Sequence, residues 1–299
     1  MTQNIPKFSI VTPILTLRNR EESWEASAGP SELREIASTA DRLGYFYLTC
    51  SEHVGIPTSV AATRGPRYYD PLATFGYMAA VTEKIRFFTN IVVLPYHHPL
   101  AVAKRYGTLD VMSEGRLMLG VGVGSLREEF ELLGAEFEKR GEIYSEALLA
   151  LRAALGKRQP VFHGEHFDFS DFIIDPCAVQ QQMPIWLGGR TPLSLRRALA
   201  AGDGWAPFSL SAQDVAALLE RAQEWPEWQE RSAPLDVALA PAQSGDATRG
   251  SGLDSLCVGI EKTLDAGATV IQFSLGATSC THYLEQIEAI AERVMPRFR

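Results

Sequence analysis

Short apolar runs alternate with amphipathic stretches along almost the whole chain. The first apolar run lies at 8–12, and the segment 31–43 follows it with apolar residues at helical spacing: Leu33, Ile36, Ala37, Ala40 and Leu43. Pro30 and Ser31 form a typical helix start, and Gly44 follows the last apolar position, where a glycine commonly ends a helix. The pattern therefore predicts a strand followed by a helix.

The same unit recurs to the end of the chain. Strands are predicted at 8–12, 45–49, 85–94, 116–121, 184–187, 204–207, 235–240 and 269–274. Helices are predicted at 31–43, 71–81, 99–112, 192–201, 212–223 and 253–266, with two helical pieces in 126–155 that separate near Gly141 and a terminal helix to about 295. Strict alternation of this kind predicts a parallel sheet with right-handed crossovers.

Eight strand–helix units in 299 residues favour an α/β fold of the closed (β/α)8 TIM-barrel type, which we expect to occupy 1–299 as one domain. The alternative is an open doubly wound sheet. Such a sheet is typically marked by a G-x-G-x-x-G turn after its first strand, and here that strand ends in Thr12 and Pro13.

Three segments interrupt the alternation. The stretch 159–183 contains HGEHFDF and is predicted to form a small hairpin inserted before the fifth strand. The loop 54–69 is long, and loops of that length in compact domains often cover a substrate site. The segment 242–252 is polar and rich in small residues, which predicts a mobile loop.

Composition narrows the class of protein. Hydrophobic residues make up 46% of the chain, which is enough for one large core, and the formal net charge of −8 argues against nucleic acid and anionic membranes as partners. The four widely spaced cysteines form no C-x-x-C pair, which indicates reduced, packed thiols. We find no run of about 18 apolar residues and no signal peptide pattern, so a cytoplasmic protein is expected.

Chemistry in a TIM barrel is carried by the carboxyl ends of the strands. The second predicted strand ends in Glu52 and His53, and histidine can exchange a proton near neutral pH. The alternative is a histidine that is merely hydrogen-bonded in its loop. The third strand carries Asn90 inside an apolar run, as either a feature of the active site or a satisfied core residue. His97 and His98 in the next loop are either substrate contacts or surface residues, and we favour the surface.

Glycines mark two further strand ends. Gly120, Gly122 and Gly124 alternate along the fourth strand, which indicates either close approach of a planar ring or steric relief inside a narrow barrel. The fifth strand ends in the segment 188–191, GGRT, directly before a helix. A glycine-rich turn at a helix N-terminus, with an added arginine, is a typical phosphate site.

Other chemistries find little support. The histidines form no H-E-x-x-H pair, so no metal site is predicted, and there is neither a G-x-S-x-G elbow nor a phosphate-cradling lysine loop. No lysine stands on a predicted strand end, which argues against a Schiff-base aldolase.

The chain resembles the luciferase-like monooxygenase superfamily, and within it the oxidoreductases that use coenzyme F420. The resemblance rests on LGYFYLTCSEHVGIPT, on the run from Tyr69 to Gly134, on FHGEHFDF and on PIWLGGRTPLSLRRALAAGDGW, and it covers roughly residues 30–206. The run 69–134 is the most specific part, whereas the C-terminal third is supported mainly by the alternation of elements.

The resemblance implies roles for the marked residues. His53 would lie near the reactive face of the cofactor ring with Glu52 beside it, and a non-prolyl cis peptide bond is implied between Asn90 and Ile91. The remaining cofactor contacts implied are Val123, Gly124, Gly188, Gly189, Arg190 and Thr191, with the last four holding the phosphate. Homodimers or larger homo-oligomers are also implied.

One position departs from the pattern. Sugar-phosphate dehydrogenases of the superfamily carry a proton-donating glutamate just after the glycine loop, where this chain has Ser125. Their substrate and that acid therefore do not transfer. The leading hypothesis is hydride transfer between a small organic substrate and coenzyme F420, with His53 handling the proton. The alternatives are a monooxygenase that uses reduced FMN and a barrel that binds a ligand without catalysis.

Overall fold

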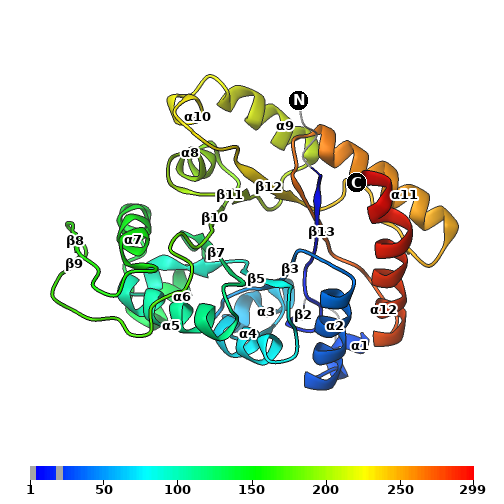
Figure 1. Cartoon of the computed structure of the whole chain (residues 1–299), viewed down its shortest axis with the longest axis horizontal. Coiled ribbons are helices and arrows are strands. Elements are labelled where there is room, and N and C mark those ends of the chain that lie inside the picture. The colour runs from blue at the N-terminus through cyan, green and yellow to red at the C-terminus, as the bar shows by residue number, and fades with distance from the viewer. Residues whose placement is uncertain (1–4, 18–22) are drawn as a thin grey trace.

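A computed structural model describes residues 5–17 and 23–299, and it shows a closed barrel of eight parallel strands (Figure 1). The barrel strands, in chain order, are β1 (Lys7–Ile10), β3 (Tyr47–Cys50), β5 (Arg86–Thr89), β7 (Leu117–Gly122), β10 (Ile185–Gly188), β11 (Gly204–Ala206), β12 (Asp236–Leu239) and β13 (Val270–Phe273). Each strand pairs with its neighbours in parallel, and the pairing of β7 with β10 completes the ring. The predicted TIM barrel is confirmed.

Helices surround the barrel. The main ones are α2 (Pro30–Arg42), α4 (Pro71–Ala79), α5 (Pro99–Met112), α7 (Arg140–Ala154), α8 (Pro192–Ala201), α9 (Ala212–Ala222), α11 (Gly250–Asp265) and α12 (Cys280–Ala289). Shorter pieces are α1 (Trp24–Ser27), α3 (Thr58–Arg64), α6 (Arg127–Leu133), α10 (Pro226–Gln229), η1 (Leu94–Tyr96), η2 (Ile290–Val294) and η3 (Met295–Phe298). Their apolar faces pack on the outward side chains of the strands and form the larger core.

One predicted strand differs from the structure. The strand predicted at 85–94 stops at Thr89 and resumes as β6 (Val92–Val93), and the interval contains a cis peptide bond between Asn90 and Ile91. The two helical pieces of 126–155 separate over 134–139, just before Gly141, which is the second residue of α7. Gly134 adopts the left-handed conformation that ends α6.

The inserted segments have structure of their own. The predicted hairpin is confirmed as the antiparallel pair β8 (Phe162–His163) and β9 (Asp168–Phe169), and it is tied to α7 because Glu146 accepts hydrogen bonds from three of its backbone N–H groups. The loop 54–69 contains α3 and β4 (Arg67–Tyr68), and β4 pairs with β2 (Thr16–Leu17).

Large side chains fill the inside of the barrel. The inward-facing residues that form this second core are Tyr47, Phe88, Met118, Trp186, Ala206, Ala238 and Val270. A Cβ on Gly204 would lie 2.4 Å from Cδ2 of Trp186. A residue without a side chain is therefore needed at this position of β11 to leave room for the indole ring. At the amino-terminal end of the barrel an ion pair of 2.8 Å joins Lys7 of β1 to Asp236 of β12.

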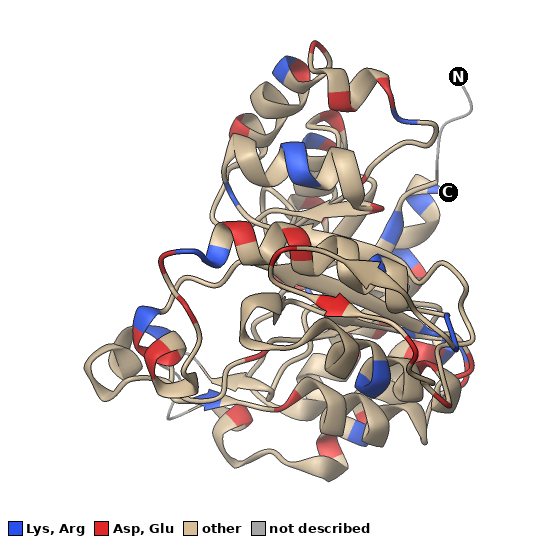
Figure 2. Ribbon diagram, turned by 90° about the vertical axis from the view of Figure 1, so that its left-hand side faces the viewer, with Lys and Arg blue, Asp and Glu red and all other residues tan. Residues whose placement is uncertain are grey.

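Basic and acidic residues are interspersed along the chain in the view of Figure 2. Ribbon positions of lysine and arginine lie among those of aspartate and glutamate there, and neither sign gathers in one region of the ribbon. Among the described residues, no helix is long and apolar enough to cross a membrane. All four cysteines are free, and burial raises the pKa of Cys50 to about 12, so its thiol stays protonated at neutral pH.

Replacing Gly120 with alanine should destabilise the protein by about 1–3 kcal/mol, because the added Cβ would lie 1.9 Å from the backbone oxygen of Thr89, which cannot move aside cheaply. Gly76→Ala is the matched control, since Gly76 lies in α4 with open space around its Cβ position, and this change should stabilise the helix by about 0.5–1 kcal/mol. Urea denaturation followed by circular dichroism measures both. Equal effects of the two substitutions would contradict the packing described for β7.

Candidate active site

The carboxyl ends of β3 and β5 are joined around the cis peptide bond. The N–H of Asn90 donates to Cys50 O at 2.7 Å, the hydroxyl of Ser51 donates to Asn90 O at 2.7 Å, and the N–H of Glu52 donates to Ile91 O at 3.2 Å. The cis bond that the sequence resemblance implied between Asn90 and Ile91 is present. The segment after β3 therefore holds this bond in place from one side.

The Glu52 carboxylate holds the segment that follows the cis bond. One oxygen accepts the N–H of Val93 at 2.7 Å, and the other lies 2.8 Å from His97 Nε2. Both oxygens are thus engaged by protein groups, and the side chain is only 10% exposed. His97 is therefore not the surface residue that the sequence suggested. His98 is exposed, but it caps α5 by accepting the N–H of Leu100.

His53 is anchored through one ring nitrogen. Its Nδ1 lies 2.9 Å from Glu129 Oε2, and its ring packs edge-on against Tyr68 with centroids 4.4 Å apart. Among the described residues, no group bonds to Nε2, and the side chain remains 18% exposed. The ring is therefore fixed in orientation while its second nitrogen stays open to a ligand.

Glu129 is the buried partner of this histidine. Its side chain is fully buried, and besides His53 it accepts the N–H of Val54 at 2.6 Å and the hydroxyl of Tyr96 at 3.0 Å. Burial alone would raise the pKa of Glu129, but the hydrogen bonds and charge of these partners outweigh it and lower the pKa below 4.5. Burial and the charge of Glu129 raise the pKa of Tyr96, so its hydroxyl remains a donor. Glu129 is consequently a carboxylate at neutral pH.

Ile91 occupies the space that two glycines leave free. A Cβ on Gly122 would lie 1.9 Å from Ile91 Cδ1, and a Cβ on Gly188 would lie 3.0 Å from Ile91 Cγ2. Gly124 has φ +81°, and its Cβ position is 2.6 Å from Val93. Packing within the barrel, one of the two interpretations of the alternating glycines, therefore accounts for them. Val123 lies half-buried between the last two of these glycines.

The GGRT segment forms the start of α8. Gly189 has φ +147°, and Ser194 lies where its Cβ would be, at 2.4 Å. The Thr191 hydroxyl accepts the N–H of Ser194 at 3.3 Å as a helix N-cap, which leaves its hydrogen free to donate. Arg190 is exposed, lies 5.8 Å from the ring of Phe208 and has no acidic partner among the described residues. A helix N-terminus with an unpaired arginine suits an anion.

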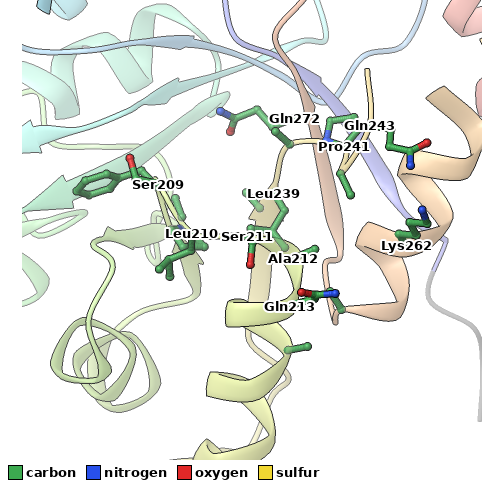
Figure 3. Close-up of a pocket in the computed structure, with 18 of the residues that line it drawn as sticks. Ser209, Leu210, Ser211, Ala212, Gln213, Leu239, Pro241, Gln243, Lys262 and Gln272 are labelled. Carbon is green, nitrogen blue, oxygen red and sulfur yellow. The ribbon is translucent and has the colours of Figure 1, made fainter. Parts of the chain in front are cut away.

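A cavity of about 910 Å³ opens at the same end of the barrel (Figure 3). Its inner wall includes Asn90 and Gln272, and its outer wall is formed by the segments after β11 and β12 together with parts of α9 and α11. In the strand order of the ring, β11 lies four places from β3, so the outer wall of the cavity is across the mouth from His53. Its inner wall reaches Asn90, whose carbonyl oxygen accepts a hydrogen bond from Ser51, two residues before His53. Asn90 is the one predicted site residue that lines this cavity.

The sequence is similar to those of known oxidoreductases. Residues 10–248 match the model of the luciferase-like monooxygenase family. The chain is 28% identical over 203 residues to an F420-dependent glucose-6-phosphate dehydrogenase of Intrasporangium calvum, covering 65% of this chain and 59% of the relative. It is also 28% identical over 193 residues to the oxygenase component of a flavin-dependent trigonelline monooxygenase of Acinetobacter baylyi, covering 63% and 51%.

The fold has relatives among solved structures. The monooxygenase RslO1 from Streptomyces bottropensis superposes with a TM-score of 0.79 at 20% identity, over 98% of this chain and all of that chain. The match of the family model spans most of the sequence. This chain belongs to the luciferase-like monooxygenase family, whose members here include F420-dependent and flavin-dependent oxidoreductases.

Sequence reasoning missed Glu129, Tyr96 and Tyr68 as neighbours of His53. Glu129 lies in LREEFELLG, and its position four residues after Ser125 marks it only as one of two adjacent acidic residues in a short helix. In the structure Glu129 and Phe130 are the buried residues of α6. The 76 residues that separate it from His53 hide their contact.

The substitution Glu129→Gln should destabilise the protein by about 1.5–3 kcal/mol at pH 7, because hydrogen bonds to a buried carboxylate are lost or weakened. The pKa of Glu129 is lowered in the folded state, so this stabilisation is present above the unfolded pKa and disappears as the pH falls through the folded value. Denaturant unfolding at pH 7 and at acidic pH measures the difference, and Glu128→Gln, in the exposed neighbour, is the control. A deficit that persists unchanged in acid would refute the electrostatic explanation.

Proposed function

We propose that this member of the luciferase-like family transfers hydride between a small organic substrate and coenzyme F420. The observation that carries the proposal is the pair formed by His53 and the buried carboxylate of Glu129. Oxidation of an alcohol removes a hydride from carbon and a proton from oxygen, and reduction of a ketone adds both. Coenzyme F420, when bound, accepts or supplies the hydride. The proton then requires a protein group at the mouth of the barrel.

His53 is suited to that task. Because Glu129 is ionised at neutral pH, it accepts Nδ1–H of the imidazole, which leaves Nε2 as the atom that takes a proton from an alcohol or returns one to a ketone. Glu129 also stabilises the imidazolium that forms in the first case. Glu52 acts beside it by holding the backbone of Val93 and the ring of His97, and so maintains the cis segment that borders the site.

The residues at α8 fit the phosphate of the cofactor. Gly188 and Gly189 bring bare backbone to the helix N-terminus, Arg190 supplies an unpaired positive charge, and Thr191 retains a free hydroxyl hydrogen. Val123, Gly124 and the bond between Asn90 and Ile91 would border the ring. These groups serve an FMN phosphate equally well.

One observation favours the alternative, a monooxygenase that uses reduced FMN. Coenzyme F420 carries a long anionic tail, and a groove rich in lysine or arginine beyond Arg190 would suit it. Of the residues that line the described cavity, Lys262 is the one cation, and Asp265 follows it one helical turn later. The choice between the two cofactors is therefore an experimental question, and direct titration answers it.

Titration of the purified protein with oxidised and reduced F420 and with FMN, followed by absorbance and fluorescence, should give tight binding of F420 and weak binding of FMN.

The substitution Arg190→Ala should lower the affinity for the cofactor about 10- to 100-fold, because a charge-assisted contact to phosphate is lost. Arg221→Ala, on the exposed face of α9, should leave the affinity unchanged. Tight binding of FMN with weak binding of F420 would establish the FMN-dependent monooxygenase instead. If the protein binds neither cofactor, both proposed functions are refuted.

His53→Asn should lower kcat about 10²- to 10⁴-fold while the cofactor affinity changes less than about threefold, since the proton-transfer group is removed without touching the phosphate site. Stopped-flow measurement of the F420 absorbance with a panel of secondary alcohols and ketones gives kcat, and the titration above gives the affinity. Unchanged turnover in this variant would remove His53 from the mechanism. A variant that loses affinity for the cofactor but keeps its kcat would instead assign a structural role to His53.

A further inference from the structure

The cavity at the barrel mouth has two arms that meet over the end of β12. Ala238 points into the barrel, where it packs in the inner core, whereas Leu239 points outward into the core beneath the helices. Both residues line the same cavity. Because successive side chains of a strand face opposite sides, the space must pass over the carboxyl end of this strand. It connects the inside of the barrel with a groove on its outside.

The outer arm runs between α9 and α11. Ala212 and Ala216 lie one helical turn apart on α9, and Lys262 and Ala266 lie four residues apart near the end of α11. Figure 3 shows the labelled residues of α9, α11 and the segment after β12 around one space, with Gln272 also facing it. The short side chains of the alanines keep the groove open between the two helices.

The walls carry little net charge. The apolar lining residues of the loops and strands are Ala206, Pro207, Phe208, Leu210, Ala238, Leu239, Ala240, Pro241 and Ala242. The charged lining residues Lys262 and Asp265 have opposite signs and are exposed at the outer end. Ser211 is already used as the N-cap of α9, where its hydroxyl bonds to Asp214. Along this route an anionic tail would meet a single lysine, Lys262, which lies exposed at the outer end with Asp265 one helical turn away.

The inner arm ends in a directed hydrogen-bond donor. Tyr47 donates its hydroxyl to Gln272 Oε1 at 2.8 Å, and burial raises the pKa of this phenol so that it remains protonated. The carboxamide of Gln272 is thereby oriented with its NH2 group available to the cavity, where it has no acceptor among the described residues. The ligand end that reaches this point must offer an acceptor oxygen.

We propose that the cavity binds an uncharged, chain-like substrate whose oxygen-bearing end accepts a hydrogen bond from Gln272 and whose apolar chain passes over the end of β12 into the groove between α9 and α11. The inference rests on the proposed function, because it assigns the substrate of that oxidoreductase. It places a medium-length secondary alcohol or methyl ketone in the site, in preference to a sugar phosphate or an organic acid.

The test uses the cofactor-loaded protein and the series of 2-alkanones from butanone to dodecanone, with Kd measured by calorimetry. The affinity of the wild-type protein should rise about three- to fourfold for each added methylene until the groove is filled, since each buried methylene contributes the same increment. Ala216→Phe should abolish this rise, so that long ketones bind no better than short ones. Butanone should bind to the variant as it does to the wild type.

Ala217→Phe is the matched control, because Ala217 lies next to Ala216 on α9 but is exposed and does not line the cavity. This variant should keep the dependence on chain length. Cofactor affinity of both variants is measured first and should equal that of the wild type, which separates this test from the proposed function. Circular dichroism confirms that both variants are folded.

Three results would overturn the proposal. The first is a wild-type affinity that does not depend on chain length, and the second is a chain-length dependence that survives Ala216→Phe; in both cases the cofactor is still bound. The third is an Ala216→Phe variant that loses affinity for the cofactor and not for long ketones, which would assign the groove to the cofactor tail. Absence of cofactor binding in the wild type would refute the proposed function itself.

Discussion

The candidate site depends on one buried carboxylate that three separate segments share. Glu129 receives hydrogen bonds from the His53 ring, the Val54 backbone and the Tyr96 hydroxyl, and thereby joins α6 to the loop after β3 and to η1. A fully buried charge is costly unless every oxygen is satisfied. The groups that donate hydrogen bonds to Glu129 also border the barrel mouth. The contacts that stabilise the buried carboxylate therefore also hold the site residues in position.

A second carboxylate, Glu52 in the segment after β3, forms a similar set of contacts with the segment after β5. Glu52 binds the Val93 backbone and His97, and so fixes the segment that leaves the cis bond, while Ser51 fixes the segment that enters it. Ile91 then projects into space that glycines on β7 and β10 leave open. Polar contacts at the rim and tight apolar packing below it thus determine the shape of the mouth together.

In the proposed reaction, three regions of the barrel mouth have different tasks. The face beside β3 handles a proton, the start of α8 offers a positive end and Arg190 for a phosphate, and the space over β12 is largely uncharged. Charge is therefore concentrated where the cofactor phosphate and the proton must be held. In this proposal the apolar chain of the substrate takes the opposite side of the mouth, and the separation would allow one barrel to bind an anionic cofactor and a neutral substrate next to each other.

The sequence alone determined the architecture, because the periods of 2 and 3.6 in its apolar residues are local properties. The helices over 99–112 and 192–201 have the predicted bounds, and the eight strands follow the predicted order. It also located Glu52, His53 and the GGRT segment, since these stand directly at strand ends. The tertiary structure alone decided the partnership of His53 with Glu129, the packing of Ile91 against two glycines, and the cavity over β12. Those features join residues that are far apart in the chain, and a periodic pattern holds no information about which distant strand ends meet.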